Sequence, residues 1–147
     1  MTDFMAAEQA VIRSLAEYTR ELCGHSAIVN EFNLRDSPIV VVEVQPRTAG
    51  ALALSIVGEQ FLNVSAGKGG RWELGYSHED VRHARRVIEA VVRGRVEEHV
   101  NGKGTSLVIE LDDGSMESTS VAEGCLSLFI PRGVRKGRAP IRRFQAY

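Results

Sequence analysis

The most constraining feature of this sequence is the alternation of apolar and other residues in four short segments between Pro38 and Tyr76. Such alternation is typical of β-strands with one buried face, because successive side chains of a strand point to opposite faces. We predict strands at 39–44, 51–57, 61–66 and 71–76. The last three strands contribute one shared apolar face, which consists of Leu52, Leu54, Ile56, Leu62, Val64, Ala66, Trp72, Leu74 and Tyr76.

The lengths of the turns decide whether these strands share that face. A register shift of one residue moves every side chain of a strand to the other side of the sheet. A three-residue turn at 58–60 sets Ile56 opposite Leu62, whereas a two-residue turn mixes the two faces. A three-residue loop at 68–70 has the same effect on the next pair of strands. Two separate connections therefore predict one meander.

Helical patterns precede and follow the meander. An apolar stripe predicts a helix over 3–22, and a second helix begins after the cap residue Ser77 and ends at Gly94. Further strands are expected at 27–34, 95–100, 105–111, 115–121 and 126–131. Consecutive strands with short connections indicate the α+β class. We predict a single antiparallel, curved β-sheet, a meander of about six to eight strands with two α-helices packed on one face.

Charge is distributed unevenly along the 147 residues. The segment 131–147 carries six basic residues and no acidic one, which leaves 12 basic against 19 acidic residues, a net charge of −7, in the rest of the chain. We find no internal repeat or linker. We therefore expect one α+β domain over 1–147, with a basic C-terminal tail at 131–147.

The composition is that of a soluble globular protein, with 44% hydrophobic and 25% charged residues. The first residues do not form a basic segment followed by an apolar run, as a secretory signal would. No apolar stretch approaches the ~20 residues that a membrane span needs. We expect a cytoplasmic protein that does not associate with membranes.

The hairpin at 113–114 contains an unusual charge arrangement. A two-residue turn sets Glu110 directly opposite Glu117 on the outer face, and like charges that face each other across a ladder are unfavourable. We expect a cation nearby, supplied by the basic tail or by a basic partner protein. An acid–base couple is disfavoured, because a flat sheet face does not separate two pKa values. A bulged turn that also uses Asp112 would shift the register and separate the carboxylates.

The second predicted helix carries four arginines on its outer face: Arg82, Arg85, Arg86 and Arg93. Glu89 is placed to pair with Arg85 and Arg93. The ordinary interpretation is a solvated helix face, and the sharper one is a patch for an acidic partner.

Three motifs that suggest chemistry have a simpler explanation. The glycine-rich stretch 67–71 lacks the Ser or Thr that follows the lysine of a phosphate loop, and a hairpin accounts for its glycines. His78 and His83 lie ~140° apart around a helix, which does not suit a shared metal. Cys23 lies at the C-terminal end of a helix dipole, which disfavours a thiolate. We predict no catalytic residue, no metal and no cofactor.

Nucleic acid is a disfavoured partner of the basic tail. The acidic body would repel the phosphates, and no RNA-binding aromatic motif accompanies the tail. We expect a protein partner instead, of which a second copy of the chain, in a homodimer, is one form.

Two functional hypotheses follow. The first is a non-catalytic protein-binding module, an immunity-type inhibitor, chaperone or adaptor, that uses the polar sheet face or the arginine helix face. Small acidic immunity and adaptor proteins are similar in size and mix of elements, which is a likeness of architecture alone. In this first hypothesis the residues expected to bind the partner are Glu110, Glu117, Arg82, Arg85, Arg86 and Arg93. The alternative is a small-molecule-binding or hydrolytic domain, with a pocket between helices and sheet near Trp72, Tyr76 and His78.

Overall fold

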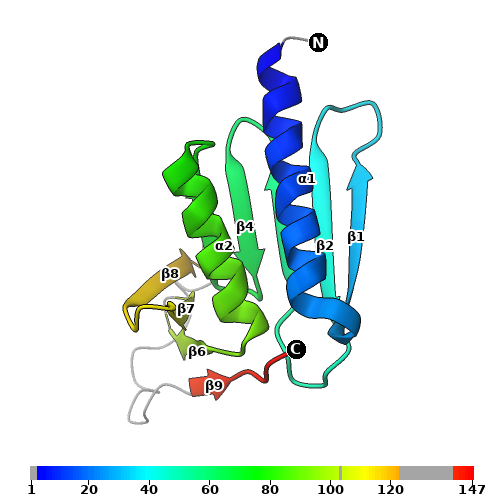
Figure 1. The fold of residues 1–147 in the computed structure, drawn as a ribbon. Coiled ribbons are helices and arrows are strands. Elements are labelled where there is room, and N and C mark those ends of the chain that lie inside the picture. The colour runs from blue at the N-terminus through cyan, green and yellow to red at the C-terminus, as the bar shows by residue number, and fades with distance from the viewer. Residues whose placement is uncertain (1–2, 103, 123–140) are drawn as a thin grey trace.

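The computed structural model describes residues 3–102, 104–122 and 141–147, which form two α-helices and nine strands in two antiparallel sheets (Figure 1). The elements in chain order are α1 (Asp3–Cys23), the 3₁₀ helix η1 (Gly24–Ser26), β1 (Ala27–Asn33), β2 (Val40–Pro46), β3 (Leu54–Gly58), β4 (Leu62–Ala66), β5 (Gly70–Leu74), α2 (His78–Val92), β6 (Val96–Asn101), β7 (Gly104–Glu110), β8 (Met116–Ala122) and β9 (Ile141–Arg143). The predicted α+β class is confirmed. The strands are divided between a five-stranded and a four-stranded sheet rather than joined in one.

The first sheet is the predicted meander, in the order β1-β2-β3-β4-β5. Its predicted inner face is confirmed, because Ile56, Val64 and Trp72 are all buried and Val64 lies directly opposite Trp72. The predicted register is wrong by two residues, since Ile56 lies opposite Val64 and not opposite Leu62. A shift of two leaves every side chain on its expected face.

The shift arises because each three-residue connection starts one residue away from the position predicted for it. Gly58 extends β3 and pairs with Leu62, so that 59–61 form the first connection. Residues 67–69 form the second, and Gly67 there adopts a φ of +56°, in the left-handed region that favours glycine. Gly67 therefore provides the left-handed residue of this turn, whereas Gly70 is the first residue of β5.

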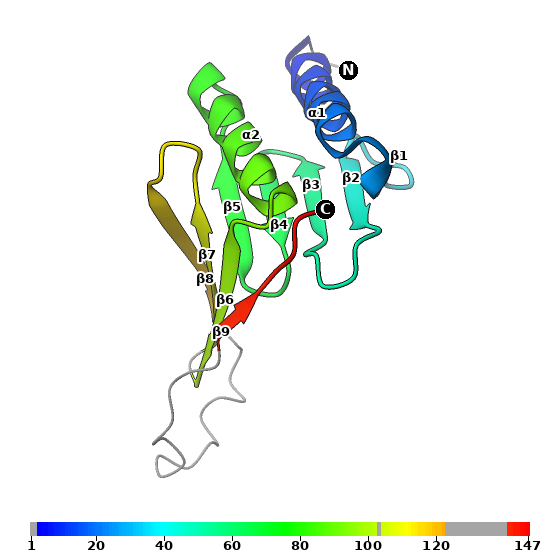
Figure 2. The same ribbon diagram turned by 60° about the horizontal axis from the view of Figure 1, so that its bottom comes forward.

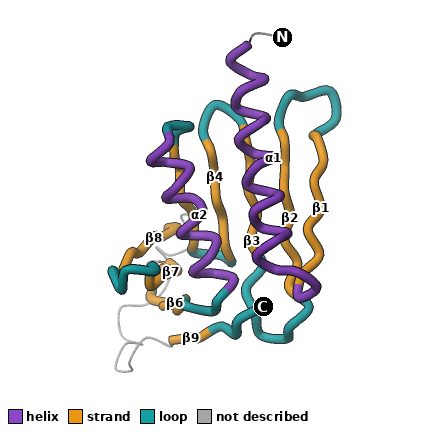
Figure 3. The backbone as a smooth tube through the Cα atoms, in the orientation of Figure 1, coloured by secondary structure: helices purple, strands orange, loops and turns teal. Residues whose placement is uncertain are grey.

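Both helices cover the same face of the first sheet, as predicted (Figure 3). α1 lies over β1, β2 and β3, and α2 lies over β4 and β5. Their apolar stripes, represented by Leu15 and Ile88, are fully buried. The predicted cap of α2 is confirmed, because Ser77 Oγ accepts a hydrogen bond from Asp80 N at 3.1 Å and the Asp80 carboxylate accepts one from Ser77 N.

The second sheet has the order β8-β7-β6-β9 and lies on the side of α2 that faces away from α1 (Figure 2). Leu107 and Ile109 of β7 are fully buried there. The two sheets meet where β8 lies beside β5. Thr119 Oγ1 accepts a hydrogen bond from Arg71 N and donates one to Gly69 O, each at 3.0 Å. A side chain therefore joins the sheets, which together curve around α2.

The end of the chain is anchored to the body of the domain. Phe144 is buried, and the backbone N–H of Tyr147 donates to Val92 O at 2.8 Å. The Tyr147 hydroxyl donates to Leu52 O at 2.6 Å. The expected strand at 126–131 and the basic residues Arg132, Arg135, Lys136 and Arg138 lie outside the described residues.

Candidate functional site

Several of the arginines predicted on the outer face of α2 make contacts within the domain. Arg86 bridges the β7–β8 hairpin, with Nε 2.6 Å from Asp112 Oδ1 and Nη2 2.8 Å from Asp113 Oδ2. Arg82 is exposed on α2. Arg86 thus helps to hold the second sheet against α2, which favours a structural role for it.

Two more of these arginines contact Glu89 and α1. Arg93 pairs with Glu89 at 2.7 Å, as predicted. Arg85 instead crosses to α1, where its Nη2 donates to Ser14 Oγ at 3.3 Å and its guanidinium lies 5.2 Å from the centre of the Tyr18 ring. Of the predicted patch, Arg82 and the exposed Arg93 face solvent most openly.

The predicted opposition of Glu110 and Glu117 is wrong. Glu110 lies opposite Met116, and Glu117 lies opposite Ile109. The hairpin has a three-residue loop at 112–114, with Gly114 at a φ of +81°, so the bulged alternative is the one that forms. The two carboxylates point to opposite faces of the second sheet.

Glu117 turns inward and joins Trp72 and His83 in what we term the junction cluster. The Trp72 indole N–H donates to Glu117 Oε1 at 2.7 Å, and His83 Nε2 lies 3.0 Å from the same oxygen. The expected neutralisation by the basic tail is not found among the described residues. Among these residues, Arg143 of the tail pairs with Glu97 at 3.1 Å and not with Glu117. The junction cluster links β5, α2 and β8, so it belongs to the joint between the sheets.

The described chain offers little for metal or thiol chemistry. Within it, no group of three His, Cys, Asp or Glu side chains is placed to hold a metal ion. Cys23 is buried, and burial raises the pKa of its thiol to about 11. A thiol with that pKa is a poor nucleophile near neutral pH, since the thiolate is the reactive form.

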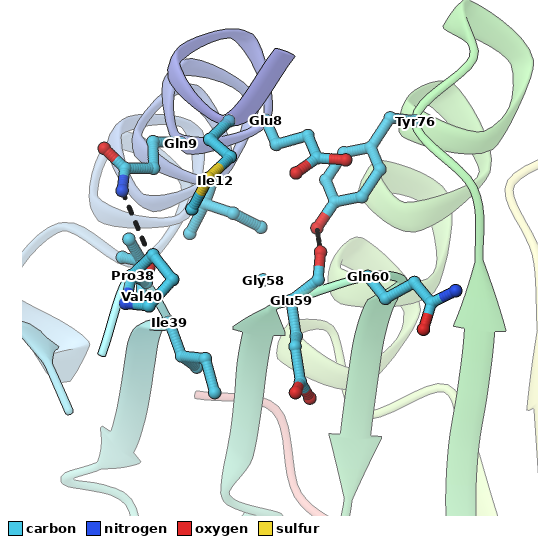
Figure 4. A pocket seen from close by; sticks show the side chains of 11 residues that line it. Glu8, Gln9, Ile12, Pro38, Ile39, Val40, Gly58, Glu59, Gln60 and Tyr76 are labelled. Carbon is cyan, nitrogen blue, oxygen red and sulfur yellow. Dashed lines mark hydrogen bonds between the residues drawn. The ribbon is translucent and has the colours of Figure 1, made fainter. Parts of the chain in front are cut away.

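The predicted pocket residues do not gather at one site. Trp72 is buried in the junction cluster, and His78 is exposed at the start of α2. Tyr76 alone of the three lines a cavity, which we term the α1 pocket (Figure 4). This pocket of about 230 Å³ opens between the N-terminal half of α1 and the ends of β2 and β3. Its lining consists of Met5, Glu8, Gln9, Ile12, Pro38, Ile39, Val40, Gly58, Glu59, Gln60 and Tyr76.

Two hydrogen bonds tie the walls of the α1 pocket together. The Tyr76 hydroxyl donates to Glu59 O at 2.8 Å, and Gln9 Nε2 donates to Pro38 O at 3.2 Å. Burial, together with the nearby charges of Glu8 and Glu59, raises the pKa of Tyr76 to about 12. The tyrosine therefore remains neutral and fixed against the β3–β4 connection.

Apolar side chains are exposed on the outer face of the first sheet and in the connections that adjoin it. Phe32 is 39% exposed, and Leu34 and Phe61 are each 44% exposed. Phe32 lies opposite Val41, which lies opposite Val57, so the apolar row crosses three strands. We term this the outer apolar patch: Phe32, Leu34, Val41, Val57 and Phe61. The alternation of 27–34 contained the signal, in apolar residues at its outward positions.

A row of polar residues borders the outer apolar patch. Directly paired positions across the five strands form this row, which consists of Asn30, Glu43, Ser55, Ser65 and Arg71. Arg71 also lies 3.8 Å from Glu73, on the same strand and face. The outer face thus has an apolar end and a polar row beside it, and Ile28 is exposed beyond that row.

Comparison with models of known protein families gives no match, and searches of curated proteins and of solved structures return no significant similarity to this chain. Neither helix in the described part of the chain has the continuous apolar length that crossing a bilayer requires.

Proposed function

We propose that this chain is a cytoplasmic, non-catalytic protein-binding module, of the immunity-inhibitor, chaperone or adaptor kind, that binds its partner through the outer face of the first sheet. The single observation that carries the proposal is the outer apolar patch, with two aromatic side chains exposed beside a polar row. Exposed apolar patches with polar borders are typical of protein interfaces.

The composition of this face suits a protein better than a small ligand. Aromatic side chains that become fully desolvated on binding supply much of the energy of an interface, and the surrounding polar groups exclude water. Phe32 and Phe61 fit the first role, and Glu43 and Ser55 fit the second. β1 is also the terminal strand of its sheet, so its outer edge can pair with a strand of the partner.

Site-specific crosslinking tests this proposal. A photoreactive amino acid replaces Phe32 or Phe61 in one set of variants and Met116 in the control, because Met116 is also apolar and exposed but lies in the second sheet. We expect positions 32 and 61 to crosslink the same protein in the cell of origin and position 116 not to do so. A crosslinked second copy would identify a homodimer. Equal crosslinking at all three positions would contradict the proposal.

A binding measurement with the crosslinked partner completes the test. The double variant F32S/F61S is expected to weaken binding by at least about 2 kcal/mol, because both aromatic anchors are removed. The control variant M116S is expected to bind as the unmodified chain does. Far-UV circular dichroism of each variant checks that the fold is kept.

A further inference from the structure

We propose that the α1 pocket binds a small amphipathic cation, an apolar ring or short chain that ends in an ammonium group. The pocket lies on the helix-covered side of the first sheet, whereas the proposed protein-binding face is the other side. The two proposals therefore rest on different residues and can fail separately.

The size of the pocket limits the ligand. A cavity of about 150 Å³ in a protein core can hold benzene, whereas sites for drug-sized ligands begin at about 300 Å³. The α1 pocket, at about 230 Å³, falls between these volumes. It suits one ring with a short side chain.

The interior of the pocket favours an apolar group. Ile12 and Val40 are buried at its base, and Met5, Pro38 and Ile39 extend the apolar wall. At Gly58 the side chain of Ile12 fills the place of a Cβ atom, since a larger residue there would overlap Ile12 Cγ1. Helix and sheet are therefore in close contact at the base, so the pocket is closed at depth and open at its mouth.

The charge at the mouth favours a cation. The lining residues, all of them within the described chain, include Glu8 and Glu59 and no Lys, Arg or His. Figure 4 shows the Glu8 carboxylate beside the Tyr76 ring, at the side of the pocket opposite Pro38. An ammonium group there can pair with Glu8 and lie against the ring face of Tyr76, which also attracts cations.

The electrostatic field at Tyr76 agrees with this arrangement. After burial, the charge of Glu8 is the next largest cause of the raised pKa of Tyr76, and Glu59 adds to it. A field that opposes a phenolate at this position also favours an ammonium ion.

Three probes of similar size and different charge test the proposal on the full chain. They are 2-phenylethylammonium, the neutral 2-phenylethanol and the anion 3-phenylpropionate, each titrated by ¹H–¹⁵N NMR with the Gly58 and Tyr76 amides as reporters. We expect the ammonium probe to bind with a Kd of about 1 mM or tighter, ahead of the alcohol and then of the carboxylate. Tighter binding of the carboxylate, shifts centred elsewhere, or no shifts at all would overturn the proposal.

Matched variants assign the charge preference to Glu8. The variant E8Q is expected to weaken the ammonium probe by about 2- to 5-fold and to leave the alcohol unchanged, because a half-exposed ion pair contributes that much. E17Q removes an exposed carboxylate elsewhere on α1 and is expected to change neither probe. The aromatic contribution is tested by comparing Y76L, which removes both the ring and the hydroxyl, with Y76F, which removes only the hydrogen bond to Glu59 O, and the ammonium probe is expected to bind more weakly to Y76L than to Y76F. Equal effects of E8Q and E17Q would refute the assignment.

Discussion

The two sheets of this domain are held in place in different ways. The first sheet is a continuous ladder of five neighbouring strands, and its buried side chains alternate along β3 and β4. The second sheet meets the first through a few side chains, of which Thr119 and Glu117 are the clearest, and Asp112 ties it to α2 through Arg86. The comparison teaches that the alternation of apolar residues along each strand specifies a sheet, whereas contacts between residues distant in the sequence decide where that sheet packs.

Removal of a buried side chain from each sheet gives the largest expected effect. Ile56 in β3 and Leu107 in β7 are both fully buried, so I56A and L107A are each expected to lower the free energy of unfolding by about 2–5 kcal/mol. Because α2 packs against both sheets, both variants should shift one common urea transition. The measurement uses far-UV circular dichroism and the fluorescence of Trp72, the single tryptophan.

Circular dichroism and Trp72 fluorescence can also show whether the two sheets unfold together or separately. If L107A changes the fluorescence of Trp72 at a lower urea concentration than the circular dichroism, the second sheet opens separately from the first. Coincident transitions would mean that the few side-chain contacts couple both sheets into one cooperative unit. M116A, at an exposed position of β8, is the control and should leave the transition unchanged.

The hydrogen bonds of Thr119 should matter next most. T119V keeps the shape of the side chain but removes its bonds to Arg71 N and Gly69 O. We expect a loss of about 1–3 kcal/mol in urea denaturation, because Gly69 is buried and its carbonyl is left without this partner. S120A, at an exposed position of the same strand, is expected to cost little. A similar loss in both variants would mean that the joint does not depend on Thr119.

The charge of Glu117 should contribute less. E117Q keeps an acceptor for the Trp72 N–H but removes the charge beside His83. Glu117 has 30% of its side chain exposed, so we expect a loss of about 1 kcal/mol in urea denaturation. E110Q is the matched control on the other face of the second sheet, and it should be nearly neutral. An equal loss in E110Q would contradict a special role for the junction cluster.

The smallest expected effect is a pH dependence at the hairpin loop. Hydrogen bonds from Ser115, followed by Arg86, lower the pKa of Asp113 from its ordinary 3.8 to about 2. The folded state therefore binds this proton less readily than the unfolded chain. Its stabilising contribution is present above pH 3.8 and is lost as the pH falls toward 2.

Urea midpoints of the unmodified chain and of D113N, compared between pH 2 and pH 6, measure this contribution. We expect the two chains to differ at the upper end of that range and to converge at the lower end. A difference that is constant with pH would mean that the charge of Asp113 does not help to hold the hairpin against Arg86.

Several elements could be predicted because their signals are local. The cap at Ser77, the helix over α1 and the inner face of the meander all depend on residues within a few positions of one another. The register could not be predicted to the residue. A shift of two leaves the alternation unchanged, so the pairing of β3 with β4 is set by the extension of β3 to Gly58, and that of β4 with β5 by the turn at Gly67.

The candidate sites were harder to predict. The error at Glu110 and Glu117 came from the choice between a two-residue and a three-residue turn, both of which suit a sequence with adjacent Asp and Gly. The α1 pocket is lined from α1, β2, the β3–β4 connection and Tyr76. Of these elements, the pocket prediction included Tyr76 alone.

By itself, the sequence determined the class of fold and the buried side of its first sheet, because a period of two can be detected within one strand. Only the tertiary structure decided that the strands divide into two sheets, that Glu117 meets Trp72 and His83, and that Glu8 lies beside Tyr76. These contacts join residues dozens of positions apart. They leave no periodic signal, since they depend on how complete elements pack together.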